Sequence, residues 1–337
     1  MSFIKLLGTI AVLLIATSAT VVGVLTQPFA AAIASQPPPV SPERLEAHVK
    51  RLSVDLYPRS QDRFHNLELA AAYIQAELKA AGAEVSVQDV NVRGLRYQNI
   101  IARFGPAAGP LLVIGAHYDS HGDAEEGARH PAGYSPETHT PGADDNASGV
   151  AGLIELARLL RDKPPSRPVE LVAYTLEEPP DFRTDHMGSV WHARALNESK
   201  RPVQLMLALE MIGCFIDADA SQQFPVPGMG LLYPERGNFI ALVGRLGDFG
   251  ATRRAKALMA GSSPLPVYSI NAPSLIEGVD FSDHRSYWNE GIPALMLTDT
   301  SFYRNMHYHQ SGDTFDRLDY RRMAQVVQAV FAVVQGM

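Results

Sequence analysis

The sequence predicts an α/β fold in a single domain: a mixed, mostly parallel β-sheet with helices on both faces. Short apolar segments alternate with amphipathic segments from about residue 84 to the end of the chain, as expected where helices connect parallel strands. Hydrophobic residues make up 46% of the 337 residues and charged residues 19%, which is enough to bury a large core. No repeat or second linker divides residues 43–337, so we expect one domain there.

The expected elements follow in order along this domain. Helical patterns cover 43–53 and 64–81, and Gly82 marks the end of the second helix. Apolar strands and amphipathic helices then alternate. The expected strands are 84–90, 98–104, 111–117, 169–176, 203–212, 266–270 and 293–298, and the further helices are 146–162, 185–198, 237–248, 250–260, 283–289 and 319–335.

An apolar segment precedes this domain. Lys5 is followed by residues 6–25, a run without a charged residue that is long enough to span a bilayer. Residues 32–34, AIA, then offer a small-residue cleavage site. We expect 1–34 to be a cleaved signal peptide or a retained membrane anchor, the length of the run slightly favouring the anchor. Residues 35–42 read as a proline-rich linker. Both alternatives predict export of the catalytic part, to the periplasm or the extracellular space.

Charge and cysteine content narrow the function. The net charge is −7 and no block of Lys or Arg is present, which argues against nucleic acid as the main partner. The single cysteine, Cys214, cannot form an internal disulfide and is expected to be a small core residue.

Acidic residues and a histidine stand at the ends of expected strands, where sites in such sheets form. The strand 111–117 ends in His117, with Asp119 two residues later. The stretch LVAYTLEEPPDF changes from an apolar strand to the adjacent pair Glu177 and Glu178, which repel each other unless a cation lies nearby. Glu210 is the only charge in an apolar strand, and a buried carboxylate without a partner is costly.

Two loop motifs complete the pattern. PGADDNASG places Asp144 and Asp145 before a helix, where a carboxylate can cap the helix or bridge two metal ions. MHYHQSGDT supplies His307 and His309 near the end of the chain. Each motif alone has a structural explanation, but one metal site accounts for all of them.

These segments, in this order, resemble the di-zinc exopeptidases of clan MH. That family includes secreted bacterial aminopeptidases, glutamate carboxypeptidase and glutaminyl cyclase. The similarity runs from about residue 112 to 315 and is carried by GAHYDS, PGADDNASG, LEEP, LALEMIG, FSDHRSYWNEGIPALMLTDT and YHQSGDT. The resemblance implies the zinc-exopeptidase fold, which is phosphorylase/hydrolase-like, two Zn²⁺ ions and a peptide substrate.

The resemblance also implies the metal ligands. Asp144 would bridge the two zinc ions, and its peptide bond to the next residue would be cis. His117 and Glu210 would complete one zinc site. Glu178 and His309 would complete the other, His309 being chosen over the neighbouring histidine because it directly precedes QSGDT.

The remaining roles concern the proton and the support of the ligands. By the same resemblance, Glu177 would be the general base, taking a proton from the attacking water and passing it to the leaving amine. Asp119 would accept a hydrogen bond from the second ring nitrogen of His117. Asp145 would stand beside the ligands without binding metal. His284, in the SDH segment, is expected to be structural or close to the site.

The expected function is therefore an exported zinc aminopeptidase. The alternatives are a glutaminyl cyclase, which GADDNASG disfavours, and a catalytically inactive binding module, which the complete ligand set disfavours. Substrate-binding residues and oligomeric state are not identifiable. Two long loops, 120–142 and 179–188, are expected to shape substrate access, and the loop histidines His121, His130 and His139 are expected to be solvent-exposed.

Overall fold

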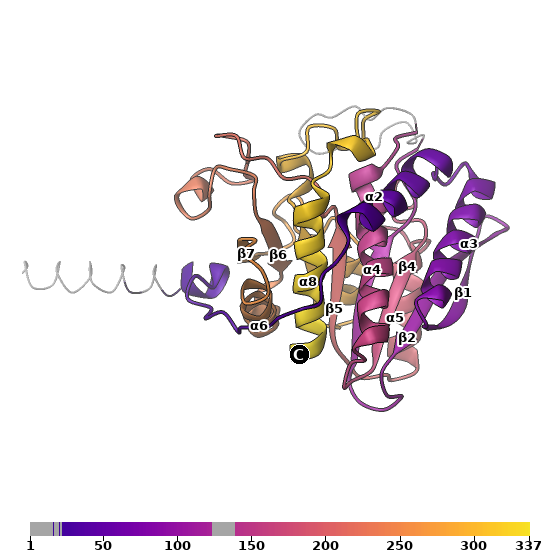
Figure 1. Cartoon of the computed structure of the whole chain (residues 1–337), viewed down its shortest axis with the longest axis horizontal. Helices are drawn as coiled ribbons and strands as arrows, with labels where there is room; N and C mark the ends of the chain where they lie inside the picture. Colours follow the sequence, from indigo (N-terminus) through magenta and orange to yellow (C-terminus); the bar gives the residue numbers. More distant parts are fainter. Residues whose placement is uncertain (1–15, 17–19, 21, 123–138) are drawn as a thin grey trace, which may run out of the picture.

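In the part of the chain that the computed structural model describes, residues 16, 20, 22–122 and 139–337, eight strands form one mixed sheet (Figure 1). The strands are β1 (Glu84–Val92), β2 (Leu95–Phe104), β3 (Leu111–His117), β4 (Val169–Tyr174), β5 (Val203–Glu210), β6 (Ile240–Gly244), β7 (Val267–Asn271) and β8 (Ala294–Thr298). Their order is β1-β2-β4-β3-β5-β8-β6-β7. The central strands β4, β3, β5 and β8 run parallel, whereas β2 and β6 join them antiparallel.

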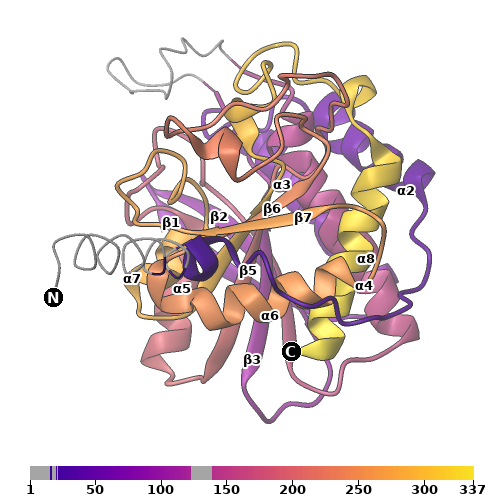
Figure 2. The ribbon, with the colours of Figure 1, turned by 90° about the vertical axis from the view of Figure 1, so that its left-hand side faces the viewer.

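Helices cover both faces of this sheet. They are α2 (Pro42–Lys50), α3 (Phe64–Ala80), α4 (Gly149–Asp162), α5 (Gly188–Glu198), α6 (Phe249–Ala260), α7 (His284–Asn289) and α8 (Tyr320–Gly336). One layer consists of α2, α3, α4, α6 and α8, and the other of α5 and α7. Figure 2 shows α4 and α8 on one side of the sheet and α5 and α7 on the other. The predicted fold class is confirmed.

Strand β3 shows how the core positions polar groups. Leu112 and Ile114 pack into the larger core under α4 and α8, whereas Leu111 and Val113 pack into the core that contains residues of α5 and α7. All seven residues of the strand are buried. A strand covered on both faces reads as a continuous apolar run, so polar side chains are displaced to its carboxyl end, where His117 stands.

One predicted helix is wrong. Residues 237–248 contain strand β6, followed by a short 3₁₀ turn over Leu246–Asp248. The apolar run pairs with β7 on one side and β8 on the other, and every residue of β6 is buried. A short, continuously apolar run is compatible with a buried strand as well as with a buried helix. Pairing with β7 and β8 makes this run a strand.

The N-terminal segment enters the fold along α6. Among the described residues, no helix has the length and apolar character needed to cross a membrane, and most of the predicted span 6–25 lies outside those residues. The Ile33 N–H donates a hydrogen bond to the carbonyl oxygen of Ala257 in α6 at 2.8 Å. The chain then passes α8, where Gln328 donates to the carbonyl oxygen of Pro38, and begins α2.

Candidate metal centre

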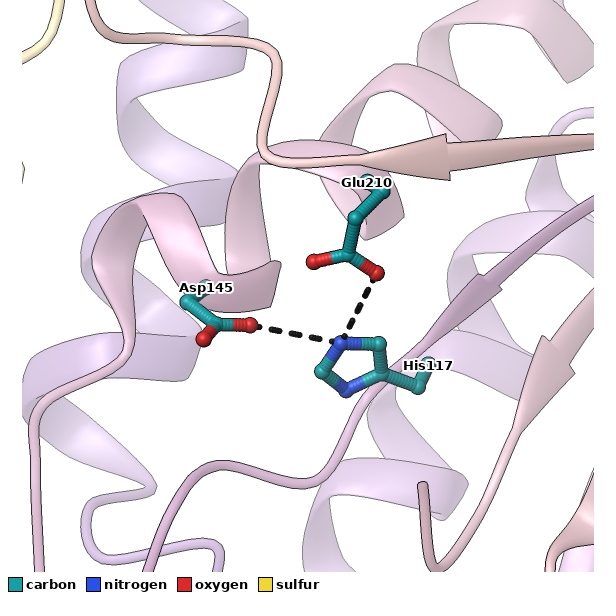
Figure 3. A group of neighbouring side chains, drawn as sticks. All are labelled: His117, Asp145 and Glu210. Atoms are coloured by element: carbon teal, nitrogen blue, oxygen red, sulfur yellow. Dashed lines mark ion pairs between the residues drawn. The ribbon is translucent and has the colours of Figure 1, made fainter. Parts of the chain in front are cut away.

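Among the described residues, two groups of buried histidine and carboxylate side chains share one aspartate at the carboxyl end of the sheet. In the first group, His117 Nε2 lies 3.3 Å from Asp145 Oδ1 and 3.4 Å from Glu210 Oε2 (Figure 3). In the second group, His309 Nε2 lies 3.1 Å from Asp145 Oδ2 and 3.2 Å from Glu178 Oε2. Asp145 therefore turns one carboxylate oxygen towards each histidine.

The shared position belongs to Asp145, so the assignment of the bridge to Asp144 is wrong by one residue. The cis peptide bond joins Asp145 to Asn146 and not Asp144 to Asp145. The Asp144 side chain points elsewhere, because its Oδ1 accepts from the Gly213 N–H and its Oδ2 from Asn305 Nδ2, both at 2.9 Å. The motif PGADDNASG contains two adjacent aspartates, and either could be the one that faces the histidines. The backbone conformation of the turn determines that it is Asp145.

Side chains from distant segments hold this turn. The Asp313 carboxylate accepts hydrogen bonds from the backbone N–H groups of Asp144 and Asp145, at 3.0 and 3.1 Å. Asn146 Nδ2 donates to the carbonyl oxygen of Leu209 at 2.8 Å, which ties the turn to β5. Asp313 was not predicted as a site residue, although it lies in the motif QSGDT.

Asp119 orients the first histidine and supports the second group. His117 Nδ1 lies 3.1 Å from the backbone carbonyl oxygen of Asp119 and 3.6 Å from its Oδ1. An N–H at Nδ1 therefore donates to the carbonyl, which leaves the lone pair of Nε2 facing the carboxylates. The Asp119 carboxylate itself accepts from the Glu178 N–H at 2.9 Å. The predicted supporting role is thus divided between its backbone and its side chain.

The adjacent glutamates after β4 separate towards different partners. Leu176, just before them, has a left-handed backbone with φ of 58°, a conformation that apolar residues rarely adopt. Glu178 then reaches His309, whereas Glu177 Oε2 lies 3.8 Å from His117 Nε2 and lines the adjoining cavity. Glu178 therefore belongs to the second group, whereas Glu177 lines the cavity.

Electrostatics at the site favour added positive charge. Among the described residues, the four carboxylates of Asp145, Glu177, Glu178 and Glu210 gather around the two histidines. Burial raises the pKa of Glu177 well above its usual value, Glu210 and Glu178 raise it further, and His117 opposes them. Burial also raises the pKa of Glu178 to about 7 against the opposing effect of His309. A divalent cation beside each histidine would offset this crowding of negative charge.

The donor set fits zinc. Imidazole nitrogen and carboxylate oxygen are ordinary Zn²⁺ ligands. The buried atoms His117 Nε2 and Glu178 Oε1 have no hydrogen-bond partner within the described ranges. Buried polar atoms normally have partners, and a metal ion at each group would supply them. The site therefore offers one place for a metal in each group.

The SDH segment contributes a serine to the site. Ser282 Oγ donates to Glu210 Oε2 at 2.7 Å, which orients that carboxylate. His284 Nε2 instead lies 2.8 Å from the carbonyl oxygen of Val279, and burial lowers the pKa of His284 to about 4. His284 is therefore a neutral structural residue. The role of Ser282 was not predicted, although the SDH segment was expected near the site.

The loop histidines do not have the expected exposure. His121 is buried, with its ring centroid 4.2 Å from that of His309, so the prediction of exposure is wrong for it. His309 also stacks on Tyr308, with ring centroids 3.7 Å apart. His139 is partly buried and pairs with Asp62 at 2.8 Å, whereas His130 lies outside the described residues.

A cavity of about 560 Å³ opens onto both groups. Its acidic end contains Glu177 and Glu210. The loop 179–188 contributes Pro179, Phe182 and Arg183, as expected of a loop that shapes access. Much of the remaining wall is aromatic, and consists of Phe224, Tyr233, Phe239, Tyr268, Phe281, Phe302, Tyr303 and Tyr308.

A third group with metal-binding residue types is satisfied without a metal. It contains Asp144, Cys214 and Asp299. Asp299 accepts from the backbone N–H of Ser301 at 2.9 Å and of Cys214 at 2.8 Å, and both Asp144 oxygens are hydrogen-bonded as described above. Burial raises the pKa of the Cys214 thiol, which keeps it neutral. This group supports the turn behind Asp145.

Sequence comparison finds a peptidase family and an aminopeptidase relative. Residues 99–334 match the model of peptidase family M28. The chain is 52% identical over 308 residues to the uncharacterised protein YfbL of Escherichia coli, covering 91% of this chain and 92% of that protein. It is 25% identical over 277 residues to a "Probable leucine aminopeptidase" of Arthroderma otae, covering 80% of this chain and 64% of that protein. The chain thus spans slightly less than two thirds of the fungal protein.

Solved structures share the fold. The LapA aminopeptidase of Legionella pneumophila is similar at a TM-score of 0.65 and 19% identity, covering 88% of this chain and 73% of that chain. A glutaminyl cyclase of Bacteroides thetaiotaomicron is equally similar, at a TM-score of 0.65 and 19% identity, covering 90% of this chain and 100% of that chain. One fold therefore serves both activities, and the choice between them depends on the site.

Proposed function

The chain belongs to peptidase family M28, and on that premise we propose that it is a zinc-dependent aminopeptidase. The observation that carries the proposal is the Asp145 carboxylate, whose two oxygens face His117 and His309 separately. We propose that one zinc ion binds to His117, Asp145 and Glu210, and a second to Asp145, Glu178 and His309. This assignment keeps the predicted count of two zinc ions and moves the bridge to Asp145.

Zinc held by these residues would make a water nucleophilic near neutral pH and would polarise the scissile carbonyl group. Glu177 is the proposed general base, because its carboxylate lines the cavity beside the first group and does not belong to either group. It accepts the proton of the attacking water and donates it to the leaving amine as the C–N bond breaks.

The cavity supports a substrate with an apolar N-terminal residue. Its aromatic walls suit an apolar side chain, and the acidic residues at the metal centre suit the positive α-amino group of an unblocked peptide. Export of the enzyme is part of the proposal and is supported by the uncharged run 6–25.

A substrate screen tests the proposal. Leucine and phenylalanine amides are supplied free or N-acetylated, with and without a chelator, beside a peptide that begins with glutamine. We expect hydrolysis of the free amides, loss of that hydrolysis with the chelator, and no turnover of the acetylated forms. Preference for acetylated substrates would contradict an aminopeptidase, and release of a cyclised N-terminus from the glutamine peptide would indicate a cyclase.

A further inference from the structure

The segment before α2 is bonded into the catalytic domain. Besides the contact of Ile33 with Ala257, the Ser35 N–H donates to the carbonyl oxygen of Gly261 at 3.0 Å. A Cβ atom at Gly261 would lie 2.0 Å from the Ile33 carbonyl oxygen, so the segment leaves no room for a side chain there. In Figure 1 the indigo chain runs past α6 and across α8 before it reaches α2.

Thr26 and Gln27 are hydrogen-bonded to buried polar side chains in the interior. Their backbone carbonyl oxygens both accept from Lys256 Nζ, at 2.9 and 3.0 Å. The Gln27 side chain accepts from Ser269 Oγ at 2.7 Å and donates to Asn271 Oδ1 at 2.8 Å. All of these residues are buried, Gln27 with only 4% of its surface exposed. These contacts are those of a folded part of the domain.

Cleavage at residues 32–34 would remove these partners. The Lys256 ammonium group makes its hydrogen bonds within the described residues to Thr26 and Gln27, and a buried cation without partners is costly. Ser269 and Asn271 would lose buried partners as well. Residues 26 and 27 thus supply hydrogen-bond partners that buried polar side chains of the domain need.

The same contacts support the wall of the active-site cavity. Ser269 lines the cavity, and Tyr233, another lining residue, donates to the Ser269 carbonyl oxygen at 2.8 Å. A short chain of hydrogen bonds therefore leads from Gln27 through Ser269 to the aromatic wall. Loss of Gln27 would loosen the part of the cavity that receives an apolar side chain.

The outer side of the segment is apolar. Phe29 is 89% exposed. Asn271, the partner of Gln27, also donates to the carbonyl oxygen of Arg245 at 2.8 Å, which brings the start of α6 close to the segment. Leu246 and Phe249 at that start are exposed too. Exposed apolar and aromatic side chains suit the interface of a lipid bilayer.

We propose that residues 26–35 remain in the mature protein as part of the catalytic domain, and that the uncharged run 6–25 before them is a retained membrane anchor. The partner of the exposed apolar surface around Phe29 and the start of α6 is then a lipid bilayer. The part concerning the cavity rests on the proposed aminopeptidase activity, whereas retention of the segment does not.

The full chain, expressed in a bacterium, tests retention directly. Cells are fractionated, membranes are washed with alkaline carbonate, and the intact mass of the protein is measured in detergent. We expect the protein in the washed membranes, with a mass that includes residues 6–34. A soluble protein whose mass begins at residue 35 would overturn the proposal, whatever its enzymatic activity.

A matched pair of variants tests the contacts. Gln27→Ala removes the buried side chain, and Gln36→Ala removes an exposed one from the same segment. In the full chain in detergent, we expect Gln27→Ala to lower Tm by about 3 °C, for lost hydrogen bonds in a domain of this size, and Gln36→Ala to leave Tm unchanged. Equal Tm values would overturn the proposal. Gln27→Ala should also raise KM for phenylalanine amide more than it lowers kcat, and an unchanged KM would remove the link to the cavity.

Discussion

Two buried clusters of charged side chains in this molecule are built in opposite ways. In the helical layer, Glu155 is 1% exposed and accepts hydrogen bonds from Arg44 at 2.7 to 3.0 Å. Arg158 and His48 approach the same carboxylate at 3.0 and 3.6 Å. At the metal centre, carboxylates crowd around His117 and His309, and within the described residues they form ion pairs only with these two histidines. The nearby buried Arg59 donates its hydrogen bonds to backbone carbonyl oxygens instead.

The pKa values of Glu155 and Glu177 are shifted in opposite directions in the two clusters. Burial would raise the pKa of Glu155, but hydrogen bonds from His48 and Arg44 lower it to about 2. Burial instead raises the pKa of Glu177, and neighbouring glutamates raise it further. The first cluster is neutralised by the protein itself and stabilises the fold. In the second cluster the proposed zinc ions would supply the positive charge, so its residues would serve binding and catalysis at some cost in stability.

Metal removal should give the largest difference in behaviour between the two clusters. With a chelator we expect complete loss of turnover, because the nucleophile and the polarised carbonyl both depend on zinc, and recovery when zinc is returned. Tm should fall as well, since zinc binds the folded state preferentially. Activity that persists after exhaustive chelation, checked by elemental analysis, would contradict a catalytic metal.

Glu177→Gln should have the next largest effect. We expect turnover to fall by about 10³-fold, because a positioned general base contributes on the order of 10² to 10⁴, while the zinc content stays unchanged. Glu277→Gln is the matched control, as Glu277 lines the same cavity from an exposed position. Equal turnover numbers for the two variants would remove Glu177 as the base.

Glu155→Gln should affect stability and leave catalysis intact. Removing one partner of a buried ion cluster exposes the remaining charges to an apolar environment, and we expect a loss of about 2 kcal/mol in the free energy of unfolding, discounted because Arg44 is half exposed. Urea unfolding measures this loss, with Glu46→Gln on the exposed side of α2 as the control. A loss of turnover with unchanged stability would reverse the assignment of the two clusters.

The pH dependence of that loss is a smaller and sharper test. The carboxyl of Glu155 has a pKa of about 2 in the folded protein against an ordinary value of 4.5. A lowered pKa stabilises the fold fully above the ordinary value, and the contribution is lost as the pH falls towards the folded value. In metal-free protein, the stability gap between wild type and Glu155→Gln should therefore narrow from about pH 5 downwards. A gap that widens in acid would contradict this account.

The sequence predicted the fold class and most of the site because strand ends impose a simple geometry. His117, Glu178 and Glu210 come together as predicted, since each ends or follows a strand at the carboxyl end of the sheet. His309 lies in a loop before α8, and only the family resemblance placed it with them. The choice between Asp144 and Asp145 was not predictable in this way, because it depends on the backbone of a single turn.

Other features depended on long-range contacts. Ser282 and Asp313 act through hydrogen bonds to residues far away in the sequence, and neither residue type indicates such a role by itself. The burial of His121 results from the packing of its loop against His309. Strand β6 was predicted as a helix because only its two neighbours in the sheet identify it as a strand.

Zinc content in a matched pair of variants tests the central claim most directly. Asp145→Asn alters the shared carboxylate, and Asp144→Asn alters its neighbour, which is hydrogen-bonded away from both histidines. With folding verified by Tm, we expect close to two zinc ions per chain in the wild type and in Asp144→Asn, and well below one in Asp145→Asn. A wild type without zinc, or zinc lost from Asp144→Asn and kept in Asp145→Asn, would contradict the account.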